Sequence, residues 1–286
     1  MKTFSTKPSI LERQEVISCP VCKDDKFIDF WDMDREYSYK KCCNCSLIYQ
    51  NPQPVASDVT SRYDDDYFEY EIENEDSFLN LMILGLKDVS FDFNPVMERK
   101  KKILDIGCAT GLFLSHMKEL GWETYGVEVC KGAAEYGNRV RGVNIFNGTL
   151  NEAPIEKESL DVIHLSHVIE HINNPDDFVK DIYSLLKPGG VIYCTTPNIS
   201  GFQAKLFKDK WRSVIPDHLI LFSIKTLKRL FTQNNFKVER HKTWGGLCAN
   251  SGYHKLIKLL LDRLAKPLGF GDVVIIKAVK PIYIDP

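Results

Sequence analysis

Between residues 100 and 200, short apolar runs alternate with longer segments of mixed polarity. The apolar runs, which have the length of buried strands, cover 101–107, 123–129, 143–146, 160–166 and 190–196. The intervening segments 112–121, 131–142 and 174–186 have helical composition, and the last begins at Asn174-Pro175, a helix-start signal. This alternation predicts an α/β fold with a mainly parallel sheet and helices on both faces. Ligands of such sheets bind outside the carboxyl ends of the strands.

Segments outside this region have patterns of their own. Residues 77–89 have the apolar density of a helix packed on the sheet domain. The carboxylate-rich segment 64–76 predicts a solvated linker, or alternatively a lid over a cationic ligand with Tyr67 and Phe68 turned inward. Residues 253–268 predict an amphipathic helix that covers the core or a homodimer partner, with peripheral membrane contact as the alternative. A last strand is expected at 272–280.

The cysteines concentrate near the N-terminus. Cys19, Cys22, Cys42 and Cys45 have the spacing C-x2-C-x19-C-x2-C, which is typical of a zinc site. Four thiolates leave no open coordination position, so the predicted ion is structural rather than catalytic. The residues between the two pairs alternate apolar and polar positions as short strands do, which predicts a zinc ribbon over residues 1–53. Cys43 is an alternative to Cys42, although the second pair would then be C-x-C.

Composition and charge narrow the functional classes. With 44% hydrophobic residues, the 286-residue chain can build a sizeable core. Its net charge of −2 lacks the basic footprint of a nucleic-acid-binding protein. No apolar run reaches the ~18 residues that a membrane span needs. The first residues lack the apolar stretch of a signal peptide, so the cytoplasm is the expected location and disulfides are not expected.

The first predicted strand of the α/β region ends in the loop DIGCATG, residues 105–111. The dinucleotide fingerprint G-x-G-x-x-G fails here, because Ala109 and Leu112 stand at the second and third glycine positions. A Walker loop fails as well, because no Gly-Lys-Ser/Thr is present. An acidic residue, a tight turn of small residues and a helix start remain. Glu128, at the end of the next strand, is placed to accept both hydroxyls of a ribose.

Together these residues resemble the class I S-adenosylmethionine-dependent methyltransferases, whose first motif runs acidic-x-Gly-x-Gly-x-Gly. Ala109 replaces the middle glycine, a change that should narrow the loop without closing it. The sequences LKPGG (186–190), the turn before the fifth strand in this family, and TPN (196–198) extend the resemblance over about residues 100–245. With the ribbon included, the chain is most similar to bacterial methyltransferases of surface-saccharide and small-metabolite biosynthesis.

The resemblance implies a fold and a domain organisation. The fold would be a Rossmann-like, mainly parallel seven-stranded sheet with helices on both faces, preceded by the small zinc ribbon. Residues 54–99 would form a linker and lid helices, and residues 100–286 the methyltransferase domain. An insertion at 199–222 would build the pocket for the methyl acceptor.

The resemblance also implies a cofactor site for S-adenosylmethionine. The residues that would hold it lie in or just after the first four strands: Asp105, Gly107, Cys108, Ala109, Gly111, Glu128, Val129, Thr149, Leu150 and Ser166. The loop after the first strand would hold the methionine end, and Glu128 the ribose. Val129 would flank adenine. Thr149 stands where the family often has an acidic ligand for adenine.

The pentapeptide HVIEH, residues 167–171, follows the fourth predicted strand. Its H-x-x-E-H order occurs in one class of zinc peptidases. Those enzymes need both histidines on one face of a continuous helix, which a strand-to-helix turn does not offer. In the family that the chain resembles, this turn lies beside the reactive methyl group, and quinone-precursor O-methyltransferases bind a divalent cation there through E-x-x-E-H. His167 replaces the first Glu, which disfavours magnesium because that ion prefers oxygen ligands.

The same turn supplies the candidate catalytic residues. Methyl transfer is an in-line displacement in which positioning provides much of the rate, and a general base adds typically ~10²–10⁴-fold. His167 is the predicted base, with Glu170 or His171 orienting it. His218, in the predicted acceptor insertion, is the second candidate. A purely structural role is the alternative for each of these histidines.

Three functions compete at this point. The leading hypothesis is S-adenosylmethionine-dependent methylation of a hydroxyl on a small molecule or saccharide. The second is RNA base N-methylation with the ribbon as a recognition module, against which the mild acidity of the chain argues. The third is a non-catalytic binding protein, against which Asp105, Gly107, Gly111 and Glu128 argue. The sequence does not identify the acceptor atom.

Overall fold

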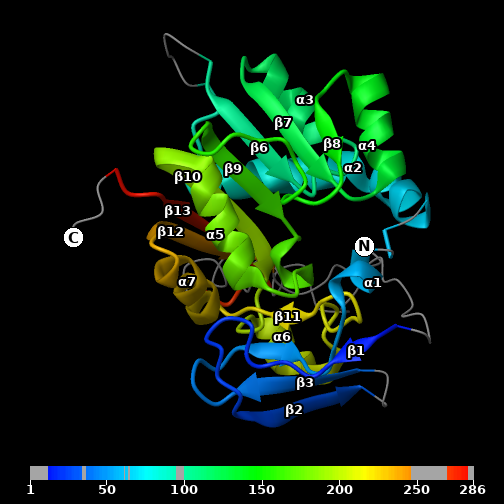
Figure 1. Cartoon of the computed structure of the whole chain (residues 1–286), viewed down its shortest axis with the longest axis vertical. Coiled ribbons are helices and arrows are strands. Elements are labelled where there is room, and N and C mark those ends of the chain that lie inside the picture. Colours follow the sequence, from blue (N-terminus) through cyan, green and yellow to red (C-terminus); the bar gives the residue numbers. More distant parts are fainter. Residues whose placement is uncertain are drawn as a thin grey trace, which may run out of the picture.

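The computed structural model describes residues 12–33, 37–60, 62–63, 65–94, 100–245 and 269–282. A seven-stranded sheet with helices on both faces forms the upper part of the molecule in Figure 1, and a smaller β unit forms the lower part. The helix expected at 253–268 lies outside the described residues. Among the residues that are described, no helix is both long enough and apolar enough to cross a bilayer.

Five parallel strands make up most of the large sheet: β6 (Lys102–Ile106), β7 (Glu123–Glu128), β8 (Ile145–Asn147), β9 (Leu160–Ser166) and β10 (Leu186–Pro197). Two further strands, β12 (Lys237–Trp244) and β13 (Val273–Val279), complete the order β12-β13-β10-β9-β6-β7-β8. Because β13 runs antiparallel to both neighbours, the sheet is mixed. The predicted seven-stranded, mainly parallel sheet is confirmed. The LKPGG residues, predicted as a turn before the fifth strand, are part of β10, but they form an irregular stretch of it: Gly189 has φ of 81°, and the register with β9 shifts between Leu186 and Val191.

Alternating side chains of the sheet pack against different helices. Leu104 and Ile163 belong to a buried cluster with residues of α5 (Pro175–Leu185) and α7 (Ile224–Gln233). Ile103 and Val162, their neighbours in sequence, pack instead with residues of α2 (Asp65–Asp88) and α3 (Leu112–Glu119). Successive strand residues point to opposite faces, so a parallel sheet covered on both sides needs apolar residues at nearly every position. This requirement explains the continuous apolar runs of the sequence.

Helix α2 includes the carboxylate-rich segment that the sequence assigned to a linker. The linker interpretation of 64–76 is wrong, because α2 starts at Asp65 and continues without a break to Asp88. The remaining α-helices of the described chain are short: α1 (Ala56–Thr60), α4 (Lys131–Tyr136), which continues as a π-helical turn Gly137–Arg141, and α6 (Phe202–Phe207). Residues Ile169–His171 and Lys208–Lys210 form 3-10 turns. Helix α2 therefore dominates the connection between the ribbon and the large sheet.

The lower unit of Figure 1 is the β structure around the four predicted zinc ligands. Its sheet has the order β11-β4-β3-β2, formed by β2 (Phe27–Met33), β3 (Tyr37–Cys42), β4 (Ile48–Gln50) and β11 (Ile220–Leu221). The strand β11 comes from the segment predicted as an acceptor insertion. A separate pair joins β1 (Gln14–Glu15) to β5 (Gln53–Pro54). The ribbon is thus completed by residues from the far half of the chain.

Candidate active site

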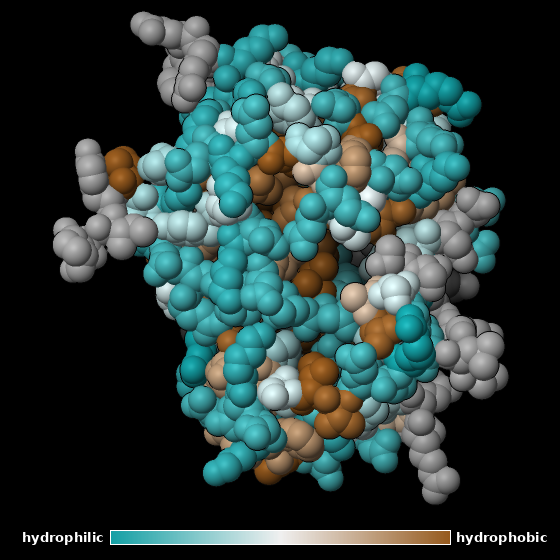
Figure 2. Space-filling model, viewed as in Figure 1, coloured by the Kyte–Doolittle hydropathy of each residue, from teal (hydrophilic) through white to brown (hydrophobic). Residues whose placement is uncertain are grey.

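A cavity of about 930 Å³ lies at the carboxyl ends of β6, β7 and β9. The loops that follow these strands form one wall, helix α2 forms another, and the segment 212–218 contributes a third. Figure 2 shows recessed apolar surface between hydrophilic rims near the middle of one face. The cavity occupies the position in which sheets of this kind bind ligands.

The loop after β6 makes a tight turn toward this cavity. Gly107, Ala109 and Gly111 all have positive φ, at 68°, 46° and 72°. A Cβ at Gly107 would lie 2.5 Å from Cγ2 of Val168, so this position requires glycine for space as well as for backbone conformation. Ala109 keeps its Cβ and still lines the cavity. The backbone of the loop can therefore approach a ligand closely.

Glu128 ends β7 and presents a buried carboxylate to the cavity. Its Oε2 accepts a hydrogen bond from the Ala109 N–H at 2.8 Å, and its Oε1 accepts one from the Cys130 N–H at 2.8 Å. Burial raises the pKa of Glu128, while these backbone donors act in the opposite direction. Each carboxylate oxygen has a second lone pair for an outside donor. The geometry fits a carboxylate that accepts the two hydroxyls of a ribose.

The structure brings the other predicted cofactor residues to the same cavity, with one exception. Those that line it are Asp105, Gly107, Cys108, Ala109, Glu128, Val129, Thr149, Leu150 and Ser166. Gly111 is not part of the lining. It precedes α3, and a Cβ there would lie 2.8 Å from Cγ2 of Val143 and 2.9 Å from Cδ1 of Ile145. Gly111 therefore serves close packing under the loop rather than direct contact with a ligand.

His167 opens the turn after β9 in a left-handed conformation, with φ of 57°. Its Nδ1 lies 3.2 Å from Oε1 of buried Glu170, whose Oε2 accepts a hydrogen bond from the Thr196 hydroxyl at 2.9 Å. Burial alone would raise the pKa of Glu170, but the hydrogen bond from His167 and the neighbouring imidazoles lower it to about 2. An ionised Glu170 accepts the Nδ1–H of His167, which leaves Nε2 of this half-exposed side chain with a lone pair.

His171 and His218 meet at the same cavity, with ring centroids 4.9 Å apart. Each donates its Nδ1–H to a backbone carbonyl at 2.8 Å, His171 to Asp217 and His218 to Ser213. Burial, together with the charge of His171, lowers the pKa of His218 to about 4. Residues 169–171 form a single 3-10 turn, so the two histidines of HVIEH do not share a continuous helix. The peptidase interpretation is excluded on this geometry.

The region of the chain that contains this site also matches a known protein family. Residues 86–241 match the model of a family described as a methyltransferase domain. The chain belongs to this methyltransferase family. The match covers the cofactor loop, Glu128 and the HVIEH turn, whereas most of α2 and the N-terminal strands of the ribbon precede it.

Relatives of known name match parts of the methyltransferase domain. A ubiquinone biosynthesis O-methyltransferase of Ruegeria pomeroyi is 35% identical over 102 residues, covering 34% of this chain and 41% of that protein. The mitochondrial ubiquinone biosynthesis O-methyltransferase of Rattus norvegicus is 28% identical over 173 residues, covering 53% of this chain and 48% of that protein. The chain thus spans less than half the length of these two relatives.

The fold is also found among solved structures. A SAM-dependent methyltransferase from Archaeoglobus fulgidus superimposes with a TM-score of 0.55 and 22% identity, covering 76% of this chain and all of that one (100%). At this level of identity the likeness concerns the fold alone. It agrees with the Rossmann-like sheet described above.

Helix α2 adds a wall that lies largely outside the family match. Tyr67, Glu71 and Glu75 line the cavity, with Tyr63 just before the helix. The expected inward orientation of Tyr67 is confirmed, whereas Phe68 packs against the Tyr136 ring, with centroids 5.7 Å apart. These four lining residues recur at every fourth position, a spacing that is typical of one face of a helix and that is visible in the sequence.

The acidic residues of this wall interact with the methyltransferase domain. Glu75 accepts a hydrogen bond from the Thr110 hydroxyl at 2.8 Å and pairs with Arg141 at 2.6 Å. Burial raises the pKa of Glu71 to about 7, and the charge of Glu128 acts in the same direction. Glu75 therefore connects α2 to the cofactor loop through Thr110, whereas Glu71 lies close enough to Glu128 for their charges to interact.

His164 is a buried partner of the cofactor loop to which the sequence gave no role. It lies beside Asp105 on the adjacent strand, and its Nδ1 is 2.7 Å from Oδ1 of that residue. A buried carboxylate is stabilised by such a donor. His164 thus holds the acidic residue of the first motif in place, and the apolar residues around it in the strand gave no sign of this.

Within the described ranges of the chain, two groups of side chains bring together atoms that could bind a metal ion. The thiols of Cys19, Cys22, Cys42 and Cys45 lie within 4.8 Å of one another, with the closest Sγ pairs at 3.5 and 3.4 Å. A tetrahedron with Zn–S bonds of about 2.3 Å has edges of about 3.8 Å, so these residues fit a structural zinc ion. Cys43 is exposed and lies outside the group. Ligand atoms of Glu170, His171 and His218 also lie within 4.8 Å of one another.

Proposed function

We propose that the protein is an S-adenosylmethionine-dependent methyltransferase that acts on a hydroxyl group of a small molecule or saccharide. The observation that carries this proposal is the single cavity shared by the cofactor loop, Glu128 and three histidines. One side of the cavity suits a nucleoside with a charged amino-acid tail. The other side offers imidazole groups at the carboxyl end of β9, where an acceptor would meet the donor.

The chain's own residues would act through position and proton transfer. S-adenosylmethionine, when bound, supplies a methyl group on a sulfonium that leaves as a neutral thioether. Glu128 would fix the ribose, and the left-handed loop at Gly107 would admit the methionine end. His167 would take the proton of the acceptor hydroxyl on Nε2, because its Nδ1–H is already donated to Glu170. His218 is a weaker candidate, since its lowered pKa makes it a poorer base.

Support for a small acceptor comes from the dimensions and the lining of the cavity. Its volume of about 930 Å³ lies within the usual range for sites that hold small molecules. Aromatic side chains of α2 and of the segment just before it help to line the cavity. The named relatives are ubiquinone biosynthesis O-methyltransferases, which is consistent with an oxygen acceptor. A saccharide acceptor is part of the proposal because the whole sequence, ribbon included, resembles bacterial methyltransferases of surface-saccharide biosynthesis.

Calorimetric titration with S-adenosylmethionine tests the donor half of the proposal. We expect binding by the parent protein and a loss of affinity of ~10²-fold or more in Glu128→Ala, because hydrogen bonds to a charged group contribute about 1.5–3 kcal/mol each. Glu135→Ala, which removes an exposed carboxylate of α4 outside the cavity lining, is the control. Equal affinity of Glu128→Ala and parent would remove Glu128 as the ribose ligand. Transfer of labelled methyl to catechol or hexose acceptors then tests the acceptor half.

A further inference from the structure

The zinc ribbon and the loop that carries His218 are joined by a dense set of hydrogen bonds. We propose that the ribbon positions the loop 213–218 for methyl transfer, with Tyr39 and Gln50 as the positioning residues. This inference rests on the proposed function for its catalytic meaning. It gives the ribbon a role inside the methyltransferase rather than in recognition of an outside partner.

Backbone pairing provides the first connection. Strand β11 joins the edge of the ribbon sheet, with Ile220 opposite Tyr49 and Leu221 opposite Ile48. The N–H of Gln50 continues this ladder by donating to the Leu219 carbonyl at 2.8 Å. The residues directly after His218 are therefore part of the ribbon sheet.

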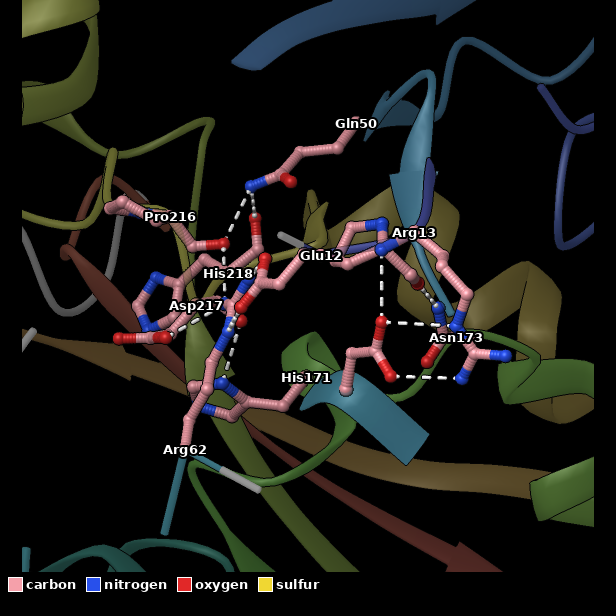
Figure 3. Close-up of polar contacts among 11 residues, drawn as sticks. Glu12, Arg13, Gln50, Arg62, His171, Asn173, Pro216, Asp217 and His218 are labelled. Atoms are coloured by element: carbon pink, nitrogen blue, oxygen red, sulfur yellow. Dashed lines mark hydrogen bonds and ion pairs between the residues drawn. The ribbon is translucent and has the colours of Figure 1, made fainter. Parts of the chain in front are cut away.

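Side chains of the ribbon provide the second connection (Figure 3). Nε2 of Gln50 donates to the carbonyls of Pro216 at 2.9 Å and His218 at 3.1 Å. The Tyr39 hydroxyl donates to the same His218 carbonyl at 2.7 Å. Tyr39 and Gln50 are both buried, so water does not compete for these carbonyl groups. Two neutral donors from adjacent ribbon strands thus fix the backbone of His218.

A buried cation provides the third connection. The Arg62 side chain is only 6% exposed. It forms ion pairs with two carboxylates, that of Glu12 at 2.7 Å and that of Asp217 at 2.8 Å. The backbone carbonyl of Asp217 accepts the Nδ1–H of His171. Figure 3 shows contacts that join Asp217 to both Arg62 and His171, with Gln50 on the other side of the loop, above the carbonyls of Pro216 and His218. Displacement of this loop would therefore move His218 and remove the partner that orients His171.

The predicted zinc ion lies at the base of this arrangement. Tyr39 lies in β3, which ends at the zinc ligand Cys42. Gln50 ends β4, the strand that follows the zinc ligand Cys45. A small ribbon depends on its metal for most of its folding free energy. The four cysteine ligands would therefore hold in register the two strands whose side chains fix the histidine loop.

The packing of the zinc loops agrees with this internal role. Cys19, Val21 and Cys45 share one buried cluster with Leu230 and Phe231 of α7. The Gln233 side chain, at the end of the same helix, donates to the Val21 carbonyl at 2.8 Å. These surfaces are occupied by the methyltransferase domain. The ribbon residues that touch it are accordingly unavailable for binding RNA or a separate protein.

Two substitutions and a matched control test the proposal. Tyr39→Phe removes one hydroxyl donor, and Gln50→Met removes an amide donor at similar volume. Tyr183→Phe removes a hydroxyl of α5 that has no hydrogen-bond partner in the described structure and lies outside the cavity lining, so it controls for the same chemical change. Each protein is compared for bound zinc, S-adenosylmethionine affinity, turnover and amide hydrogen exchange over residues 213–221.

We expect Tyr39→Phe and Gln50→Met to lower turnover by ~10-fold or more, because small displacements of catalytic groups are costly. Zinc content and cofactor affinity should stay within about 2-fold of the parent, since the cofactor loop is separate from the 213–218 loop. Exchange over 213–221 should accelerate in both variants and stay unchanged in Tyr183→Phe. This split between turnover and binding is one that general destabilisation would not produce.

Other results would overturn the inference. Parental turnover in both variants, or parental exchange over 213–221, would show that the ribbon does not hold the loop. Equal losses of cofactor affinity and turnover would show a general structural role instead. If the parent binds cofactor but methylates no acceptor, the proposed function fails, whereas the exchange data still decide whether the ribbon fixes the loop.

Discussion

His167 combines the two properties expected of a general base in this cavity. Its Nδ1–H is held by an ionised carboxylate, and its half-exposed ring lines the space where an acceptor would lie. We expect His167→Ala to lower turnover by ~10²-fold or more while the affinity for S-adenosylmethionine changes little. Steady-state kinetics and calorimetry measure the two effects separately.

The competing histidines make this experiment decisive. His116→Ala, on α3 and outside the cavity lining, serves as the control and should keep parental turnover. If His218→Ala shows the large loss and His167→Ala is mild, the base is His218 despite its lowered pKa. Full activity of both variants and of the double variant would leave positioning alone as the mechanism.

Helix α2 makes a contribution to the pH dependence of stability that can be tested at one residue. Its Glu71 has a pKa raised to about 7 by burial and by Glu128. The folded state therefore holds a proton on Glu71 that the unfolded chain, with an ordinary pKa near 4.5, releases earlier as pH rises. Stability falls across this window, from about pH 4.5 to about 7.

Replacement of Glu71 by glutamine should remove that fall in stability. We expect Glu71→Gln to match the parent near pH 4.5 and to be more stable at pH 8, by on the order of 2 kcal/mol. Thermal denaturation at both pH values measures the difference. Glu69→Gln, on the exposed side of the same helix, should show no such growth with pH. A constant difference between parent and Glu71→Gln would contradict the buried-carboxylate explanation.

The elements also differ in how far the sequence predicted them. Strands β6, β9 and β10 were predicted because burial on both faces leaves largely apolar runs, and β7 was predicted from its place in the alternation of strands and helices. The first half of α2 was missed, because its inner face consists of Tyr and Glu rather than aliphatic residues. Strand β11 has two residues and exists only through its pairing with β4, so no local pattern announces it.

The candidate site likewise contains some residues that the sequence predicted and others that it did not. Glu128 and the glycine loop were predicted because cofactor chemistry requires those residue types at that spacing. Gln50 and Tyr39 were missed because they act on backbone carbonyls, which every residue has. The placement of Gly111 in packing rather than in the cavity lining also depends on tertiary neighbours.

For the whole molecule, the zinc ion predicted at the four cysteines is the natural variable to change. The four cysteines near the N-terminus lie in the same buried cluster as α7, and the ribbon sheet includes β11. We expect gradual zinc removal by a chelator to lower turnover before it lowers the affinity for S-adenosylmethionine. Zinc content, turnover and calorimetric affinity, followed in parallel, measure this order. Readdition of zinc should restore turnover, and loss of affinity at the same zinc occupancy would contradict the expectation.

The pairing of β4 with β11 also has a consequence for synthesis of the chain on the ribosome. His218, next to β11, follows Gln50 of β4 by 168 residues. At about 5–20 residues per second, translation needs on the order of 10–30 s to cover this distance. During that interval the nascent ribbon has an unpaired strand edge, which is a template for association with other chains. We therefore expect the nascent ribbon to associate with other chains more readily than the finished protein, in which β11 covers the edge of β4.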